Sequence, residues 1–316
     1  MATKVFFYTL RPYDELGIAQ RLAPQLDVEF GSTQEYPTLE NAELAKGYDA
    51  VSVTPCDMST PMVKRFHELG VKSICCRSIG YDHVDRETAR ELGMKVANVD
   101  YPPNGVANFA IMLMLMSLRK AGHILKRGEA QDYSLQGKIG RDISTCTVGV
   151  IGTGRIGRTV LQHLSGFGCR LLAYDLYPND EVKKIAEYVP LDELYARADV
   201  ISLHCNLTAE NTGMICRDSI AKMKDGAILL NNARGQLLNE RDVADALNSG
   251  KLAAAGLDVV STEPIRDDNP LLTAKNCLIT PHISWAPKES RQRILDTTIE
   301  NIKAYQAGKP VHVVNG

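Results

Sequence analysis

Apolar runs and amphipathic stretches alternate along nearly the whole chain, a pattern typical of parallel β-sheets whose strands are joined by helices. In the first hundred residues, the runs that predict strands are Lys4–Tyr8, Val28–Phe30, Ala50–Val53, Ser73–Cys76 and Lys95–Val99. Amphipathic stretches at Pro61–Leu69 and Arg86–Leu92 predict helices between these strands. A long helical region, from Asn104 to about Gln131, follows this first series.

A second series with the same alternation begins at residue 147. Its predicted strands are Thr147–Ile151, Arg170–Tyr174, Val200–Leu203, Ala227–Leu230, Ala253–Val259 and Leu278–Ile279. Its predicted helices are Ile156–Phe167, Asp218–Met223 and Glu240–Ser249, and a last helix lies near Lys288–Ala307. We therefore expect an α/β protein with two doubly wound, parallel-sheet domains.

Composition narrows the class of protein. The 316 residues are 44% hydrophobic and 23% charged, which is typical of a soluble globular protein. The formal net charge of -2 gives no electrostatic reason to expect nucleic acid or a membrane surface as a partner. The longest apolar stretch, Phe109–Leu118, is about half the length needed to span a bilayer. The apolar N-terminal run is better interpreted as a buried strand than as a signal peptide.

The eight cysteines include no CxxC pair, and most lie in apolar segments. We interpret them as reduced thiols of the core, and we expect no metal site and a cytosolic location.

The clearest single motif is Gly152-x-Gly154-x-x-Gly157, which follows an apolar run and precedes an amphipathic helix. In a strand–turn–helix unit, such glycines allow a tight turn and close approach of the backbone to a pyrophosphate. Asp175 ends the next predicted strand, where a carboxylate accepts the adenosine ribose hydroxyls and repels a 2′-phosphate. The pattern predicts a dinucleotide site for NAD rather than NADP, with Arg155 and Ile156 in the loop.

Three later segments end an apolar run with polar residues, at the edge where open α/β sheets bind ligands. They contain Arg234, then Asp258 and Glu263, then His282 and Trp285. Taken singly, each has a structural alternative: a surface ion pair for Arg234, a cap or solvated loop residue for Glu263, and a hydrogen-bonded histidine at a strand end for His282. Their order behind a dinucleotide motif favours a catalytic site.

Together these segments resemble the D-isomer-specific 2-hydroxyacid dehydrogenases, over nearly the whole chain. The matching motifs are RSIGYDHVD (77–85), the glycine loop, HCNLTAENTG (204–213), NNARG (231–235), LDVVSTEP (257–264), PHISW (281–285) and GKPVHVVN near the end. The resemblance implies an NAD-binding Rossmann domain, 102–287, inserted into a flavodoxin-like substrate domain, 1–101 with 288–316. It also implies a homodimer formed through the helix after the first crossover.

The resemblance assigns roles that agree with the chemistry of 2-keto acid reduction. Arg234 binds the substrate, since a planar guanidinium can contact both the carboxylate and the carbonyl. His282 gives the carbonyl oxygen its proton and acts as the base in oxidation, and Glu263 orients that imidazole and favours its charged form. Ile79, Gly80 and Tyr101 match the groups that meet the substrate carboxylate, and Trp285 lies beside His282. The residues that match cofactor contacts are Cys205, Asn206, Asn211, Asn232, Ala233 and Asp258.

The branch of the family stays open at this point. The segment DYPPNGVA, with Tyr101, resembles D-lactate dehydrogenases, which predicts reduction of pyruvate or a close analogue. The segment STEPIRDDNPLL resembles glycerate dehydrogenases and hydroxypyruvate reductases instead. Thr54 stands where an aromatic side chain often walls the pocket of the lactate group, so a longer substrate is a further possibility. The alternative from another class is a non-catalytic, NAD(H)-sensing protein of the corepressor type.

Overall fold

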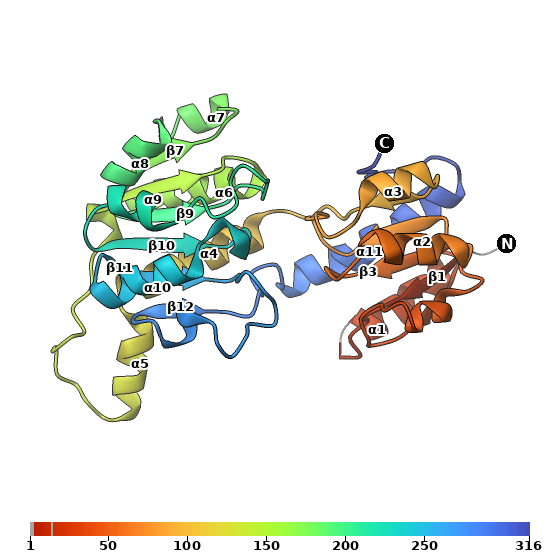
Figure 1. Ribbon diagram of the computed structural model, residues 1–316, viewed down its shortest axis with the longest axis horizontal. Coiled ribbons are helices and arrows are strands. Elements are labelled where there is room, and N and C mark those ends of the chain that lie inside the picture. The colour runs from red at the N-terminus through yellow and green to blue at the C-terminus, as the bar shows by residue number, and fades with distance from the viewer. Residues whose placement is uncertain (1–2, 14) are drawn as a thin grey trace. The chain divides into compact units, whose positions relative to one another are not determined.

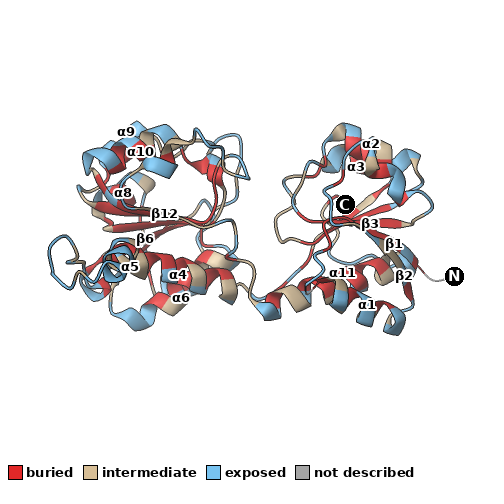
Figure 2. Ribbon diagram, turned by 90° about the horizontal axis from the view of Figure 1, so that it is seen from below, coloured by how far each residue is buried: buried red, intermediate tan, exposed pale blue. Residues whose placement is uncertain are grey.

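The computed structural model describes residues 3–13 and 15–316. The chain divides into two compact units, and the second is inserted into the first along the sequence. The first unit contains the residues up to Pro102 together with Pro287–Gly316, and the second is Pro103–Ala286. Each unit has its own parallel sheet with helices on both faces (Figures 1 and 2).

The first unit has a five-stranded sheet in the order β2-β1-β3-β4-β5. All four neighbouring pairs are parallel. The strands are β1 (Thr3–Phe7), β2 (Val28–Ser32), β3 (Ala50–Val53), β4 (Ser73–Cys76) and β5 (Lys95–Ala97). This strand order is that of flavodoxin-like folds.

The helices of the first unit are α1 (Glu15–Gln25), η1 (Asn41–Ala45, a 3-10 helix), α2 (Thr60–Glu68), α3 (Arg86–Glu91) and α11 (Lys288–Gln306). Figure 2 shows α2 and α3 on one face of the sheet and α1 and α11 on the other. Phe66 belongs to the core on the first face, and Ala19 and Ile299 belong to the core on the second. The end of the chain returns to β5, where the N–H of Val314 donates to the carbonyl of Val96 at 2.9 Å.

The second unit has a seven-stranded sheet in the order β12-β11-β10-β9-β6-β7-β8, and all its pairs are parallel. The strands are β6 (Thr147–Ile151), β7 (Arg170–Tyr174), β8 (Glu187–Tyr188), β9 (Val200–Leu203), β10 (Ala227–Asn231), β11 (Leu252–Leu257) and β12 (Cys277–Ile279). The central strands are buried on both faces, as their continuous apolar runs predict.

The helices of the second unit are α4 (Asn104–Leu118), α5 (Ala121–Glu129), α6 (Arg155–Leu164), α7 (Asp180–Lys183), α8 (Leu191–Arg197), α9 (Arg217–Lys222) and α10 (Glu240–Ser249). Short 3-10 helices are η2 (Ile143–Thr145), η3 (Ser165–Phe167), η4 (Gly235–Leu237) and η5 (Pro270–Thr273). Side chains of α8, α9 and α10 form the core on one face of the sheet, and those of α4, α6 and α7 form the core on the other.

The predicted α/β class with two doubly wound parallel sheets is confirmed. The predicted helical region from Asn104 to about Gln131 consists of two helices, α4 and α5. The chain breaks at Lys120, whose φ of 52° lies in the left-handed region that a continuous helix cannot accept. The helices α1, α7 and α8 and the short strand β8 were not among the predicted elements.

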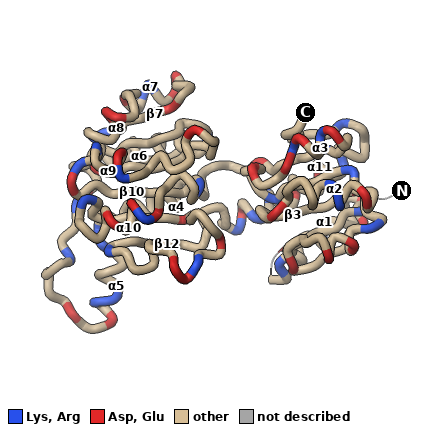
Figure 3. The backbone as a smooth tube through the Cα atoms, viewed as in Figure 1, with Lys and Arg blue, Asp and Glu red and all other residues tan. Residues whose placement is uncertain are grey.

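Positive and negative side chains are interspersed along both units (Figure 3), in keeping with the small net charge. Among the described residues, no helix is long and apolar enough to cross a membrane. All eight cysteines are free thiols.

Candidate active site

The candidate site residues of the second unit follow its strands at the edge where the parallel strands end. Gly152 follows β6, Asp175 follows β7, Cys205 lies just beyond β9, Asn232 follows β10, Asp258 follows β11 and His282 lies just beyond β12. The strand order therefore puts His282 and Asp258 towards one side of this edge, and Gly152 and Asp175 towards the other. This edge is where ligands of open α/β sheets bind.

The glycine loop between β6 and α6 depends on the absence of side chains. Gly152 has a φ of 92°, and a Cβ there would lie 2.5 Å from the Cys205 nitrogen. A Cβ on Gly157 would collide with the main-chain oxygen of Gly152, whereas one on Gly154 would meet nothing within 4 Å. Gly154 is also the N-cap of α6, with no side-chain cap. The first N–H groups of the helix are therefore available to a phosphate.

Asp175 is bonded directly to this loop. Its Oδ2 accepts hydrogen bonds from the Thr153 N–H at 2.5 Å and from the Thr153 hydroxyl at 3.0 Å, and its Oδ1 accepts one from the Tyr177 N–H at 2.9 Å. The Thr153 hydroxyl also lies 2.7 Å from the hydroxyl of Tyr188. The carboxylate is thus fixed beside the glycine loop, in the position that adenosine ribose recognition needs.

The segment that follows β9 packs against the glycine loop. Burial lowers the pKa of the His204 imidazole to about 4, so the ring is neutral near pH 7, and its Nε2 lies 2.8 Å from the Ser202 hydroxyl. Burial raises the pKa of the Cys205 thiol to about 11, so the thiol is protonated at neutral pH and is not a nucleophile. Asn211 folds the next turn by donating to the Asn206 carbonyl at 2.7 Å.

Asn231 ends β10, and the turn that follows carries Asn232, Ala233 and Arg234. The buried Asn231 amide fixes it by accepting from the Ala233 N–H at 3.0 Å and donating to the Arg234 carbonyl at 2.8 Å. The Asn232 side chain is buried, and within residues 3–13 and 15–316 neither its oxygen nor its nitrogen has a hydrogen-bond partner. A buried amide of this kind fits a bound polar ligand that supplies the missing partners.

His282 and Glu263 form a close pair. The His282 Nδ1 lies 2.7 Å from the Glu263 Oε2, and the two side chains are 34% and 39% exposed. A carboxylate accepting from Nδ1–H fixes the tautomer and favours the protonated ring. Nε2 is then the ring nitrogen that can exchange a proton with a substrate. His282 has a φ of 50°, in the left-handed region.

Asp258 fixes the main chain at His282 through hydrogen bonds. Its side chain is fully buried, and its carboxylate accepts from the Thr280 hydroxyl at 2.6 Å and from the N–H groups of Ile283 and Ser284 at 3.0 and 2.9 Å. Its carbonyl accepts from the His282 N–H at 2.8 Å. The indole N–H of Trp285 donates to the His282 carbonyl at 2.7 Å.

Several supporting residues were not predicted from the sequence. Thr153 and Thr280 orient Asp175 and Asp258 through their hydroxyls. Thr153 directly follows Gly152, and Thr280 directly precedes the motif PHISW (281–285), so both could have been predicted from their position next to these motifs. Among the described residues, no cluster of His, Cys, Asp or Glu could hold a metal ion.

Comparison with known proteins identifies the family. Residues 111–284 match the model of the D-isomer specific 2-hydroxyacid dehydrogenase NAD binding domain. The chain belongs to this family. It is 46% identical to a hydroxypyruvate reductase of Blautia hydrogenotrophica, over 81% of this chain and 83% of that protein. It is 38% identical to an aromatic 2-oxoacid reductase of Clostridium sporogenes, over 84% and 85%.

Solved structures agree. The apo-structure of D-lactate dehydrogenase from Escherichia coli superposes with a TM-score of 0.89 at 34% identity, covering 99% of this chain and 100% of that one. This 2-hydroxyacid dehydrogenase is an NAD-dependent oxidoreductase, as the sequence predicted. The residues of this chain that fit a bound dinucleotide are those of the glycine loop, Asp175 and Asn232, whose buried amide has no hydrogen-bond partner among the described residues.

In this dehydrogenase, the loop expected to bind the substrate carboxylate belongs to the first unit and follows β4. The Asn98 amide donates to the Ile79 carbonyl at 2.8 Å, and the Ser78 hydroxyl donates to the Gly80 carbonyl at 2.6 Å. These two bonds fix the turn that carries the main-chain N–H groups of Ile79 and Gly80, the groups expected to meet the substrate carboxylate. Tyr101, the other predicted substrate residue of this unit, is 6% exposed.

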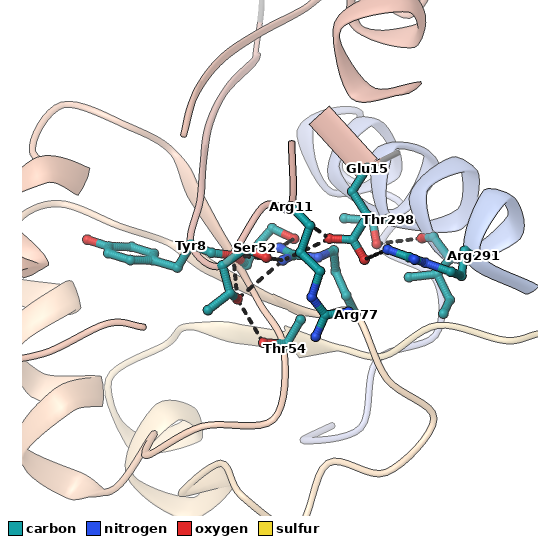
Figure 4. A network of polar contacts seen from close by, with 10 residues as sticks. Tyr8, Arg11, Glu15, Ser52, Thr54, Arg77, Arg291 and Thr298 are labelled. Atoms are coloured by element: carbon teal, nitrogen blue, oxygen red, sulfur yellow. Dashed lines mark hydrogen bonds and ion pairs between the residues drawn. The ribbon is translucent and has the colours of Figure 1, made fainter. Parts of the chain in front are cut away.

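A buried arginine lies directly before that loop (Figure 4). One Arg77 nitrogen donates to the Ser52 carbonyl at 3.0 Å, and the other donates to the Tyr8 carbonyl at 2.7 Å, so the guanidinium caps the ends of β3 and β1. Burial lowers the pKa of Arg77 to about 10, which still leaves it charged at neutral pH. Glu15 lies 3.9 Å from Arg77 and 3.1 Å from Arg291.

Thr54, the residue predicted to enlarge the pocket, lies at the edge of this network. Its hydroxyl is 2.7 Å from that of Thr9, and both side chains are buried. Because the Thr9 hydroxyl is 2.7 Å from the Tyr8 carbonyl and donates to it, Thr54 is the donor of the pair and keeps a lone pair for another hydroxyl.

Proposed function

We propose that His282, Glu263 and Arg234 are the catalytic residues of this dehydrogenase. The observation that carries the proposal is the 2.7 Å contact between the His282 Nδ1 and the Glu263 carboxylate, because it prepares the imidazole to release a proton from Nε2. In reduction, His282 gives its proton to the carbonyl oxygen of the 2-keto acid. In oxidation, the neutral imidazole takes that proton from the hydroxyl.

Arg234 binds the substrate carboxylate and polarises its carbonyl, for which a planar guanidinium is suited. NAD, when bound, supplies or accepts the hydride at the substrate carbon. The residues that hold it are those of the glycine loop, Asp175, the segment of Cys205, Asn206 and Asn211, the turn of Asn232 and Ala233, and Asp258.

We assign substrate binding to the first unit, 1–101 with 288–316, and cofactor binding to 102–287. The main-chain N–H groups of Ile79 and Gly80 receive the substrate carboxylate together with Tyr101, and Trp285 walls the reacting carbon. The positive charge of the buried Arg77, next to this loop, favours binding of an anionic substrate there.

The proposed substrate is a small 2-keto acid, pyruvate giving D-lactate or a close analogue. Hydroxypyruvate is the second candidate, and a specific observation favours it: the small Thr54 side chain has a lone pair for a substrate hydroxyl, which a phenyl ring would lack. The relative that shares 46% identity is a hydroxypyruvate reductase, which supports the same choice.

We further propose a cytoplasmic homodimer with no nucleic-acid or membrane partner. In α4 the side chain of Met112 is 40% exposed, and after α5 those of Tyr133, Leu135 and Ile139 are more than 70% exposed. Apolar side chains gathered on one segment in this way are typical of an interface. Light scattering of the purified protein tests the dimer.

The test of the function is a series of keto acids assayed with NADH and with NADPH. We expect NADH-dependent reduction of pyruvate or hydroxypyruvate to the D-hydroxy acid, and the ratio of kcat/KM for these two acids decides between them. Loss of one matched polar contact changes such a ratio by about tenfold or more. NADH binding without turnover of any keto acid would favour the binding protein of the corepressor type.

A further inference from the structure

Glu240, the first residue of α10, makes contacts that the catalytic assignment does not use. Its Oε1 accepts a hydrogen bond from the Ser261 N–H at 2.7 Å. Its Oε2 accepts one from the Ser261 hydroxyl at 2.7 Å and one from the Asn269 amide at 2.9 Å. One carboxylate therefore binds both ends of the loop 261–269.

That loop carries Glu263. It has no helix or strand between Ser261 and Asn269, and Thr262, Glu263 and Pro264 are exposed. Besides its contact with His282, Glu263 accepts a hydrogen bond from the Val260 N–H, just before the loop, to its Oε1 at 3.3 Å. Ile265 packs against the core, but residues 262–264 are exposed, so the contacts at the ends of the loop contribute to where the Glu263 side chain lies.

The same loop is joined to the turn of Arg234. The Gln236 amide donates to the Ser261 carbonyl at 3.0 Å. Gly235 packs so closely on the Val260 main chain that a Cβ there would collide with it. Ser261 is therefore held through its N–H, its hydroxyl and its carbonyl, and these contacts connect the segments that carry Arg234 and Glu263.

We propose that Glu240 is a positioning residue that keeps the Glu263 carboxylate within hydrogen-bond distance of His282. This inference rests on the proposed roles of Glu263 and His282. Without Glu240, the loop keeps its sequence but loses the acceptor at both ends, and Glu263 spends less time beside the imidazole. The protonated form of His282 is then less favoured, although neither catalytic side chain has been changed.

The test is the pH dependence of kcat/KM for keto acid reduction by NADH in Glu240→Ala, Glu240→Gln and the wild type. Reduction needs the protonated imidazole, so we expect the alkaline limit of Glu240→Ala to move to lower pH by about half a unit, a loss of about threefold above that limit. Glu240→Gln keeps one acceptor oxygen and should recover part of the shift. Asp245→Ala removes an exposed carboxylate from the same helix, one that has no hydrogen bond or ion pair with the loop among the described residues, and it should leave the profile unchanged.

A double variant separates positioning from general damage. In the Glu263→Gln background, Glu240→Ala should cause no further shift of the alkaline limit, because the group that it positions is gone. A shift of the same size in both backgrounds would overturn the inference. An equal loss of rate at every pH would also overturn it, since that outcome indicates damage to the fold.

The controls also separate this inference from the proposed function. A wild-type profile in Glu240→Ala, together with a shifted profile in Glu263→Gln, overturns the role of Glu240 and leaves the function standing. No shift in Glu263→Gln itself overturns the role of Glu263 and the inference with it. If Glu240→Ala does not fold, Glu240→Gln decides: a partial shift that disappears in the Glu263→Gln background supports the inference, and a wild-type profile overturns it.

Discussion

Asp258 lies directly behind His282 and fixes the backbone of the catalytic histidine from within the core. The His282 N–H donates to the Asp258 carbonyl at 2.8 Å, while the buried Asp258 carboxylate accepts the next two main-chain N–H groups. An aspartate that the family resemblance predicts to lie along the cofactor thus also orders the loop 280–285.

We expect Asp258→Asn to lose activity and stability together. The amide nitrogen of Asn would face N–H donors where a carboxylate oxygen now accepts, leaving buried groups unsatisfied at a cost of about 1–3 kcal/mol. Urea unfolding measures this loss, and kcat measures the displacement of His282. Thr280→Val, which removes a single hydroxyl donor, is the milder control. Wild-type stability in Asp258→Asn would contradict the bonding described here.

Glu263→Gln should move both pH limits of the reaction downwards. The carboxylate favours the protonated imidazole, which reduction needs, so without it reduction fails at a lower alkaline pH. Oxidation needs the neutral ring, so its acid limit also falls. Because the pair is more than a third exposed, solvent screens the interaction, and we expect both limits to move downwards only modestly. Initial rates in both directions across pH test this, and unchanged limits would remove Glu263 from its role.

Much of the fold could be predicted because strand and helix periodicities are local. The continuous apolar runs of Val200–Leu203 and Ala227–Leu230 predicted buried central strands, and the structure places them side by side. The break at Lys120 could not be placed, because the residue in the left-handed conformation is a lysine, whereas the nearby glycine, Gly122, lies inside α5. Helix α1 has a proline near its end and only a weak apolar face, so its pattern was ambiguous.

The candidate site divides in the same way. Gly152 and Asp175 could be predicted because they act through a short motif and a fixed spacing. The bond between Glu240 and Ser261 could not, since it joins residues 21 positions apart and depends on how the ends of β10 and β11 lie together. Glutamate in the first turn of a helix is common for reasons of the helix dipole alone.

His282→Asn should abolish most of the activity without unfolding the protein. The left-handed backbone of His282 is one that Asn accepts better than most residues, so we expect stability within about 0.5 kcal/mol of wild type. Loss of the proton donor should lower kcat by about a hundredfold or more. His282→Val is the matched control, because a β-branched residue strains this backbone. Full activity in a stable His282→Asn protein would exclude the histidine as donor.

Asp175→Ser should narrow the preference for NADH over NADPH. The carboxylate repels a 2′-phosphate, and its removal relieves a penalty of a few kcal/mol. The Asp175 carboxylate also accepts a hydrogen bond from the Thr153 hydroxyl. Tyr188→Phe is therefore the control, because this variant removes another contact of the Thr153 hydroxyl but keeps the negative charge of Asp175. The kcat/KM ratio for the two cofactors should change in Asp175→Ser alone. Equal use of both cofactors by the wild type would contradict the assignment.

His204 should make the protein sensitive to acid. Burial lowers the pKa of its imidazole from 6.5 to about 4, so between these values the unfolded chain binds a proton that the folded ring does not. The contribution is fully present above pH 6.5 and is lost as the pH falls towards 4, for a total of about 3 kcal/mol. His204→Gln should remove this dependence, so that its free energy of unfolding falls less than that of the wild type between pH 7 and pH 5, by about 2 kcal/mol. Ser202→Ala removes the hydrogen-bond partner but keeps the imidazole, and it should stay acid-sensitive. Urea unfolding of the three proteins at both pH values decides the matter, and parallel losses in wild type and His204→Gln would show that other groups cause the acid sensitivity.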